Sequence, residues 1–596
     1  MFISTNTNPA MAMASPHSST IDFDVEREPE TPSSSTATTV IPSYPPPVTE
    51  GQKVDAGYNP QVEDSDIDTR YAASLHDDGE TEQNENRNGN GNDHAEKPTN
   101  TPSPHHTSSL PREAAFIATL CTTQLFTQAS LAQAIAPLHI IGASFSISSP
   151  GELSWFPAAY SLTVGTFILI AGRLGDLYGH KRFFVAGWIW YGVWSLLAGL
   201  AVYVPSRHDG GGGAVFFDVC RGMQGIGPAF LLPNALAILG RTYPQGRRKE
   251  MVFSIFGATA PSGFVLGAVF ASLFAQVGWW PWAFWCMGIL CFGMGGLGWY
   301  VIPTTPTPVL QDDEDDGVGM WERCDGMGCV TGVTALVLVN FAWNQGPVVG
   351  WSTPYTYALL ILGFVFLALF AWVESRASHP LLPKEALTRD TAFVLGCMAA
   401  GWSSFGIWVF YGWQFLEELR GTSPLLTSAQ FVPCAFSGLA AALTTGHILH
   451  HVGPSIVMMV AMTAFTTGLV LIATAPVQQT YWVQTFISIC IMPWGMDMSF
   501  PAATILLSDH MPKKHQGVAA SLVNTVINYS VSIGLGFAGT IESRVNKGGE
   551  EVLKGYRGAW YMGIGLAGLG ICISALFGGS QLRERRKVAK GVGVGT

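Results

Sequence analysis

Long apolar runs separated by short polar loops dominate the chain from about residue 112 to residue 580. A hydrocarbon core about 30 Å thick needs roughly 20 apolar residues for each spanning helix, which predicts about 14 membrane helices here. They are expected near residues 114–137, 152–171, 183–204, 215–239, 251–276, 281–302, 327–346, 354–374, 391–416, 425–446, 455–475, 480–506, 516–540 and 557–578. The run at 327–346 is the least apolar because Asn340, Trp343 and Asn344 interrupt it.

Composition agrees with an all-α integral membrane protein, because 48% of the chain is hydrophobic and only 12% is charged. The first 111 residues differ: they are rich in Ser, Thr, Pro and Asn, with a net charge of −13 against +2 for the remainder. Such a segment has too few apolar side chains to offset its ordering entropy. We expect residues 1–111 to be a disordered acidic tail.

The distribution of Lys and Arg predicts the orientation in the membrane. If the tail is cytoplasmic, the loops on its side and the C-terminus carry 18 Lys and Arg, against 6 in the opposite loops. This bias supports an even number of helices, so both termini are expected to be cytoplasmic.

An internal repeat suggests two halves, because GRLGDLYG (172–179) and GHILHHVG (446–453) share their Gly and Leu/Ile spacing. Each would join the second and third helices of a six-helix half, as in many secondary transporters. We predict an N-terminal half at 112–303, a linker with two extra helices at 304–390, a C-terminal half at 391–579 and a basic tail at 580–596.

The loop GRLGDLYGHKR (172–182) interrupts the apolar pattern with charges. Gly172, Asp176, Gly179 and Lys181 resemble, in spacing and position, the loop signature of the major facilitator superfamily. The glycines permit a tight turn, and Lys181 and Arg182 would hold it on the cytoplasmic side. By the resemblance, Asp176 reaches the N-terminus of a helix of the other half and latches the outward-open state.

Two further stretches agree with that family. RGMQGIGPA (221–229), which includes Gly225, resembles its R-x-x-Q-G element, and GATAPSGFVLG (257–267) resembles the Gly/Pro motif of antiporters. The second stretch supplies small residues that close helix packing also explains, namely Gly257, Pro261, Gly263 and Gly267.

Together these features resemble the 14-helix drug:proton antiporter branch. Within it, QAIAPLHIIG (133–142), GMDMSFPAA (495–503) and residues 516–536 resemble the fungal aminotriazole-resistance and boron-efflux group. In helix 1 the branch's usual Asp falls at Gln128, which cannot carry a proton, so we do not expect proton coupling there. Gln124 and Gln128 are candidates for lining the cavity, although interhelical hydrogen bonding explains them equally well.

Charged residues inside apolar runs are functional candidates, because a charge within the bilayer costs about 2.5–3.5 kcal/mol. Arg221 is a candidate for a cavity-facing substrate or proton-linked site, and its alternative is a structural ion pair with Asp218. Asp497 is the candidate proton carrier, and its alternative is a hydrogen bond to Asn524 or Asn528.

Aromatic residues of 401–419 supply candidates for a cavity wall that accommodates planar or cationic solutes, namely Trp402, Phe405 and Trp408. An interfacial aromatic belt explains these three equally well, and we favour the belt for Trp413 and Phe415.

No G-x-x-x-x-G-K-S/T or H-E-x-x-H motif occurs, so the sequence favours a secondary transporter over an enzyme or an ATP-driven pump. We expect no cofactor, metal or nucleic acid, and partners limited to a small-molecule substrate, protons and the lipid bilayer, with a monomer as the assembly. The expected function is proton-coupled efflux of drugs, toxins, secondary metabolites or weak acids such as borate, at the plasma or the vacuolar membrane. The alternatives are uptake or facilitated exchange, and a transporter-like sensor.

Overall fold

Helices account for nearly all of the chain that the computed structural model describes, which is residues 110–205, 211–243, 247–304, 319–382, 388–509 and 516–592. In lipid every backbone polar group needs an internal partner, and a helix supplies it within one segment. Contacts along the chain divide it into residues 1–100 and 101–596, and all described residues belong to the second part. The predicted acidic tail therefore lies outside the described residues.

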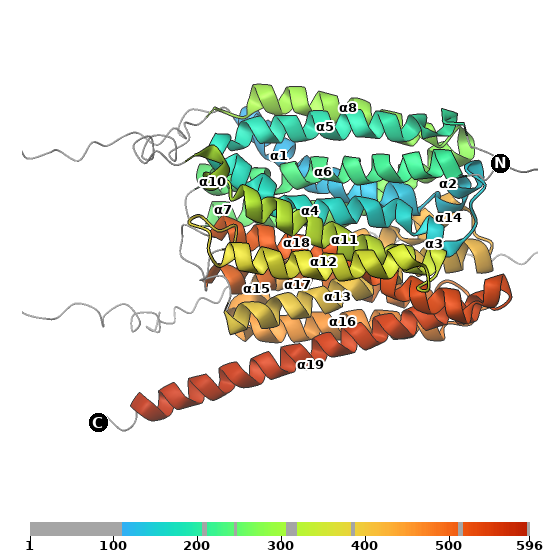
Figure 1. Cartoon of the computed structure of the whole chain (residues 1–596). Helices are drawn as coiled ribbons and strands as arrows, with labels where there is room; N and C mark the ends of the chain where they lie inside the picture. The colour runs from blue at the N-terminus through green and yellow to red at the C-terminus, as the bar shows by residue number, and fades with distance from the viewer. Residues whose placement is uncertain are drawn as a thin grey trace, which may run out of the picture. The chain divides into compact units, whose positions relative to one another are not determined.

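Six long helices form the N-terminal half, with short helices at two of their connections (Figure 1). Their bounds are α1 Leu110–Ile135, α2 Leu138–Ser144, α3 Pro150–Leu153, α4 Trp155–Tyr178, α5 His180–Leu200, η1 Ala201–Tyr203, α6 Gly211–Thr242, α7 Arg247–Val277 and α8 Pro281–Val301.

A short helix and two inserted long helices follow, and then the six long helices of the C-terminal half. The insert contains α10 Met320–Arg323, α11 Gly326–Val349 and α12 Pro354–Glu374. The C-terminal half contains α13 Arg389–Gln414, η3 Phe415–Leu419, α14 Pro424–Gln430, α15 Val432–Val452, α16 Pro454–Thr474, α17 Gln484–Asp509, α18 Gln516–Val545, η5 Lys547–Gly549 and α19 Val552–Val592. The predicted order of helices is thereby confirmed.

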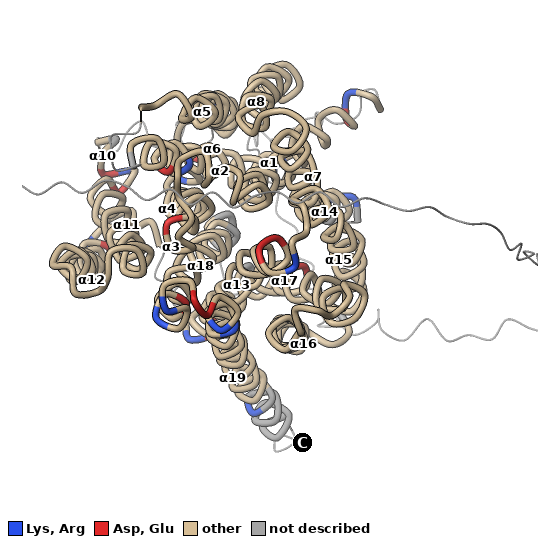
Figure 2. Tube along the Cα trace, turned by 90° about the vertical axis from the view of Figure 1, so that its right-hand side faces the viewer, with Lys and Arg blue, Asp and Glu red and all other residues tan. Residues whose placement is uncertain are grey.

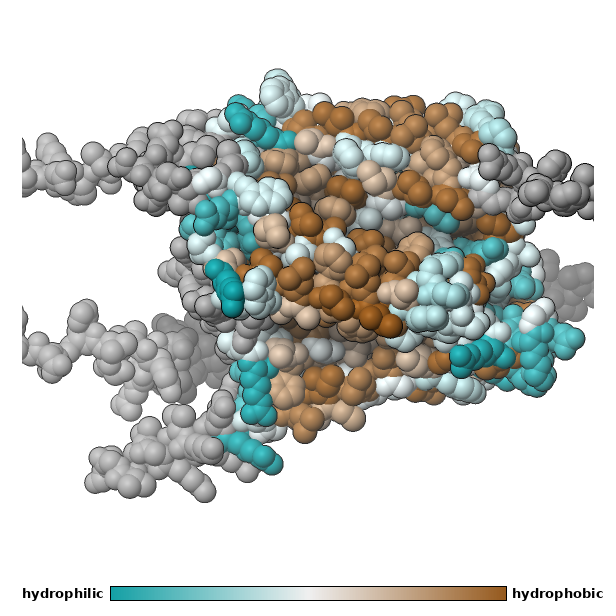
Figure 3. Space-filling view, viewed as in Figure 1, coloured by the Kyte–Doolittle hydropathy of each residue, from teal (hydrophilic) through white to brown (hydrophobic). Residues whose placement is uncertain are grey.

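Thirteen of the described helices are long and apolar enough to cross a membrane. The remaining predicted span is α1, whose hydropathy is lowered by threonines and glutamines although it packs among the others. Figure 3 shows the result as an apolar band between two polar ends. The chain is therefore a multi-pass membrane protein.

The two ends of the bundle are distinguished by their loops. We call the end where α4 meets α5 at Gly179 the motif end, and the end that carries α2, α3 and α14 the far end (Figure 1). The helix α1 begins at the motif end, as the contact between Glu113 and Arg248 at the start of α7 shows. There α19 also ends, because Ser455 at the start of α16 contacts Gln581. The first and last long helices thus start and finish at one end, as an even number requires.

Seen from the far end, the two halves lie side by side and the inserted pair covers one edge of their boundary (Figure 2). The boundary has two seams, α4 against α18 and α7 against α15. At Gly165 on α4, a Cβ atom would lie 2.6 Å from the backbone nitrogen of Tyr529 on α18. Only glycine allows this approach, so the first seam is packed backbone to backbone.

Candidate functional site

The motif loop is held by a polar network within the N-terminal half. Asp176 accepts from Arg241 at 3.0 Å and lies 3.3 Å from Nε2 of His180, whose Nδ1 lies 2.8 Å from Oδ1 of Asn234. Gly179 turns the chain with φ of +103°, a conformation that favours glycine. A Cβ atom at Gly175 would lie 1.8 Å from Asn234, so glycine is required there as well.

These contacts bear on the predicted latch. The partners of Asp176 named above all belong to its own half, and the Asp176 side chain is half exposed. Gly172 of the loop motif does approach the other half. A Cβ atom added at Gly172 would lie 3.3 Å from Oγ of Ser521 on α18. The latch with Asp176 therefore remains a prediction about a different conformation. Lys181 lies over the Trp299 ring at 5.2 Å, and Arg182 is exposed.

A second network at the motif end ties α1 to α7. Arg248 donates to both carboxylate oxygens of Glu113 at 2.6 Å, and the Tyr243 hydroxyl donates to Oε1 at 3.0 Å. Burial and the neighbouring carboxylate raise the pKa of Tyr243 to about 12, so its hydroxyl keeps the proton that it donates.

Arg221 is completely buried, and each of its three guanidinium nitrogens has a partner. Nε donates to the Phe156 carbonyl at 3.0 Å, Nη2 donates to the Ser130 carbonyl at 2.8 Å, and Nη1 donates to Gln224. The Tyr160 ring covers the guanidinium at 4.6 Å. The expectation that Arg221 faces the cavity is wrong for this conformation, because the residue crosslinks α1, α4 and α6 inside one half.

The alternative of an ion pair with Asp218 is not seen as a direct salt bridge among the described residues, although each of the two charges acts on the other through space. The enclosed Oδ1 of Asp218 has no hydrogen-bond partner. Carbonyl dipoles, an amide and an aromatic face stabilise the cation instead.

The predicted glycine positions of α7 divide into two kinds. At Gly263 and Gly267 a Cβ atom would lie 2.2 Å and 2.3 Å from the carbonyls of Leu125 and Ala129, so α7 packs directly on α1. Gly225 has the same role between α6 and α4, where Tyr160 and Thr163 approach it. The packing expectation is wrong for Gly257, because a Cβ atom added there would have no atom of another helix within 4 Å.

Asp497 lies about half-way along α17, at the seam between α7 and α15. Its Oδ2 is enclosed and has no hydrogen-bond partner. A Cβ atom at Gly438 on α15 would lie 2.6 Å from this oxygen and 2.8 Å from the ring of Pro261 on α7. The carboxyl group therefore lies beside Gly438 of its own half, at the point where Gly438 also packs against Pro261 of the other half.

Asn528 donates to the Asn524 carbonyl at 3.0 Å on its own helix. The alternative, a hydrogen bond from Asn524 or Asn528 to Asp497, stays a prediction. Sequence reasoning found Asp497 but missed Gly438, since one small residue among many carries no signal of its contact.

The aromatic residues of α13 are packed within the C-terminal half. Trp402 donates to Ser499 at 3.2 Å and Trp408 donates to Ser488 at 2.9 Å, and Phe405 lies between the two rings. All three side chains are at least nine-tenths buried. On α1, Gln124 and Gln128 are half-buried and make no hydrogen bond with described residues, so interhelical bonding does not explain them here.

The expected aromatic belt is wrong for Trp413 and Phe415, which are buried. Trp413 stacks on Phe431 at 4.0 Å and contacts Phe264 of α7 at 5.9 Å. Farther along α7, Ser272 lies 2.8 Å from Ser428. These contacts join the two halves between Pro261 and the far end.

The chain's matches to known proteins agree with this geometry. Residues 118–535 and 391–593 match the family model described as Major Facilitator Superfamily. The chain belongs to this superfamily. It is thus a membrane transporter rather than an enzyme.

The chain aligns with most of the length of three fungal relatives. A low affinity ammonium transporter of Saccharomyces cerevisiae is 64% identical over 479 residues, which are 80% of this chain and 91% of that protein. Efflux pump terJ of Aspergillus terreus is 52% identical over 482 residues, 80% and 90% of the two chains. The aminotriazole resistance protein of Saccharomyces cerevisiae is 40% identical over 472 residues, 78% and 84% of the two chains. The resemblance to the aminotriazole-resistance group is confirmed.

Proposed function

We propose that this transporter exports small organic compounds or weak acids in exchange for protons. Asp497 carries this proposal, because it is an acidic side chain at mid-depth whose enclosed oxygen has no partner and which lies beside Gly438, where its own half packs against Pro261 of the other half. Transporters of this kind bind substrate and ions near the bilayer midplane between their repeats. A carboxyl group whose surroundings change when the halves rock apart binds a proton with a different affinity in each state.

The direction of the cycle follows from the orientation that we propose. The motif end carries the excess of Lys and Arg and would face the cytoplasm, with both termini on that side of the plasma membrane. The contacts of Phe264, Ser272 and Pro261 with the C-terminal half support a conformation that is closed toward the far end. Such a state would load substrate from the cytoplasm. The assembly would be a monomer, since each chain contains both halves.

Uptake on the same fold is the second candidate. The observation in its favour is that a relative with 64% identity is named as an ammonium transporter. Ammonium and protonated weak bases would interact with the same unpaired carboxylate of Asp497.

Reconstituted vesicles test the two candidates. Radiolabelled aminotriazole and methylammonium serve as probes, and their flux is measured with an imposed pH gradient of either direction and with none. The export proposal expects the probe to accumulate in the compartment from which protons leave, and Asp497→Asn to lower this flux about tenfold or more. Asp218→Asn is the matched control, because it changes a membrane carboxyl that lies away from the seam.

Each outcome separates the alternatives. Flux of either probe that ignores the gradient in the unmodified protein contradicts proton coupling and favours facilitated exchange. Full gradient-driven flux in Asp497→Asn removes this residue from the mechanism but leaves the exporter intact.

A further inference from the structure

The inserted helix α11 lies along the seam between α4 and α18, with α12 outside it (Figure 2). Its contacts with α18 follow one face of each helix. The Tyr529 hydroxyl donates to the Leu336 carbonyl at 3.1 Å, and the Trp343 and Phe537 rings lie 4.5 Å apart. A Cβ atom at Gly536 would lie 2.8 Å from the Trp343 backbone, so the two helices approach closely.

A buried polar junction joins α11 to both halves at once. Oγ of Ser532 on α18 lies 2.9 Å from the Ala158 carbonyl of α4 and 2.8 Å from Oδ1 of Asn340 on α11. Asn344 donates to the same Oδ1 at 2.8 Å. Ser532, Asn340 and Asn344 are all at least 99% buried, so no water competes for these bonds.

The junction leaves polar atoms without partners. Nδ2 of Asn340 and Oδ1 of Asn344 are enclosed and make no hydrogen bond. In a membrane interior an unpaired amide group is costly, and a leucine would fill the same place without that cost. The two asparagines therefore contribute something other than stability to α11.

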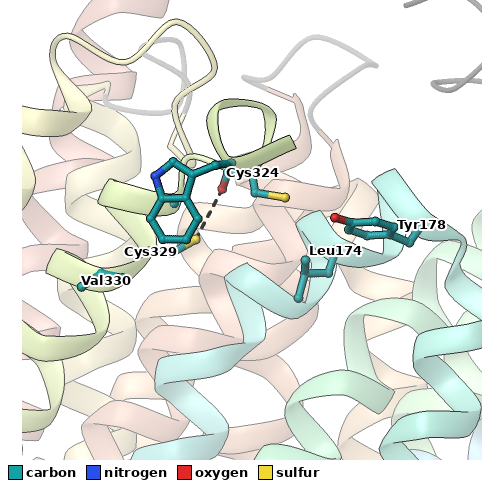
Figure 4. Close-up of a pocket in the computed structure, with 7 residues that line it drawn as sticks. Leu174, Tyr178, Cys324, Cys329 and Val330 are labelled. Atoms are coloured by element: carbon teal, nitrogen blue, oxygen red, sulfur yellow. Dashed lines mark hydrogen bonds between the residues drawn. The ribbon is translucent and has the colours of Figure 1, made fainter. Parts of the chain in front are cut away.

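The rest of α11 is held unevenly along its length. Toward the far end, the Phe341 ring lies 5.2 Å from Trp155 of α4, and Gly151 packs on Pro347 and Val348. Toward the motif end, α10 and α11 leave a pocket of about 400 Å³ against α4, which Leu174, Tyr178 and Cys324 help to line (Figure 4). Near Ser532 the insert thus packs closely on α4, whereas at the motif end it meets α4 across the pocket and through Arg173, which donates to the Arg323 carbonyl of α10 at 2.9 Å.

We propose that α11 is a clamp on the seam between the halves. The Ala158–Ser532–Asn340 link stabilises the conformation in which α4 and α18 lie together near the far end. Rocking of the halves moves α4 relative to α18 and must break this link, so the insert sets the balance between conformations without touching substrate. The unpaired amide atoms of Asn340 and Asn344 are then available for new partners once Ser532 has moved away.

Hydrogen exchange of the full chain in lipid nanodiscs, without substrate, tests the clamp. Ser532→Ala and Asn340→Leu should each speed amide exchange about fivefold in peptides from 155–165 and 530–545, as expected for the loss of one hydrogen bond. Gln345→Leu is the matched control, because this neighbouring amide bonds only Tyr355 of the inserted pair at 3.1 Å and should leave both segments unchanged.

The double variant sharpens the result. If Ser532 and Asn340 act through one link, Ser532→Ala with Asn340→Leu should exchange no faster than either single variant. Unchanged exchange in 155–165 and 530–545, or acceleration spread evenly over the bundle, would overturn the clamp. Because no substrate or gradient is used, failure of the proposed proton coupling would leave this measurement valid.

Discussion

Arg221 and Asp497 both lie inside the bundle, and their surroundings differ completely. Arg221 in the N-terminal half has a partner for each nitrogen and an aromatic ring over its face. Asp497 in the C-terminal half has an enclosed oxygen without a partner and lies beside Gly438, which packs against Pro261 of the other half. A fully bonded charge fixes structure, whereas an unpaired one can respond to protons or ligand. The burial of a charged side chain alone therefore does not tell whether its role is functional or structural, and its hydrogen bonds must also be known.

The largest expected effect is on stability at the bonded charge. Arg221→Met should lower the unfolding temperature strongly, because it leaves the Phe156 and Ser130 carbonyls and Gln224 without their donor, at about 1–3 kcal/mol each. Fluorescence-detected size-exclusion chromatography after heating measures this. Asp218→Asn is the control and should retain the unfolding temperature. A stable Arg221→Met protein would refute the structural role.

The next largest effect is expected at Gly438, where α15 packs on α7 beside Asp497. Gly438→Ala would place a methyl group 2.6 Å from Asp497 and 2.8 Å from Pro261. Overpacking of this kind costs about 1–3 kcal/mol. The Asp497 side chain can turn away from the methyl group, whereas the clash with Pro261 lasts as long as α7 and α15 are together. Transport should therefore fall by roughly tenfold with little change in the unfolding temperature. Gly446→Ala, with no atom within 4 Å of the added methyl, should transport normally.

A smaller effect is expected at the motif loop. Asp176→Ala removes an exposed pair with Arg241, worth about 0.2–1 kcal/mol, and the latch predicted for the other conformation. The transport rate should change a few-fold while the range of substrates stays the same, as growth of an expressing strain on a panel of toxic compounds would reveal. An altered range of substrates would contradict a purely conformational role.

The smallest effect is expected at Trp402 on α13, and it shows whether this side chain only packs or also contacts substrate. Trp402→Phe removes one hydrogen bond to Ser499, worth about 0.5–1.5 kcal/mol. If Trp402 only packs, the unfolding temperature falls slightly and KM is unchanged, as should also hold for Trp408→Phe. A KM raised threefold or more in Trp402→Phe alone would assign this ring to the substrate cavity.

The amino-acid pattern alone predicts the class of protein, the order of the helices and the residues worth testing. Spacing of apolar runs is sufficient for this, because the bilayer fixes the length of each helix. The loop signature and Asp497 were visible for the same reason, since charges are rare in such runs.

The surroundings of each candidate become visible only in the three-dimensional arrangement of the helices. Arg221 and Asp497 are both charges in apolar runs, yet their roles depend on which carbonyls, glycines and prolines of other helices surround them. Gly438, Ser532 and the partners of Asn340 carry no distinguishing signal in the chain. Their contacts join residues as far as 374 positions apart along the chain. Packing between helices depends on shape that local sequence patterns do not contain.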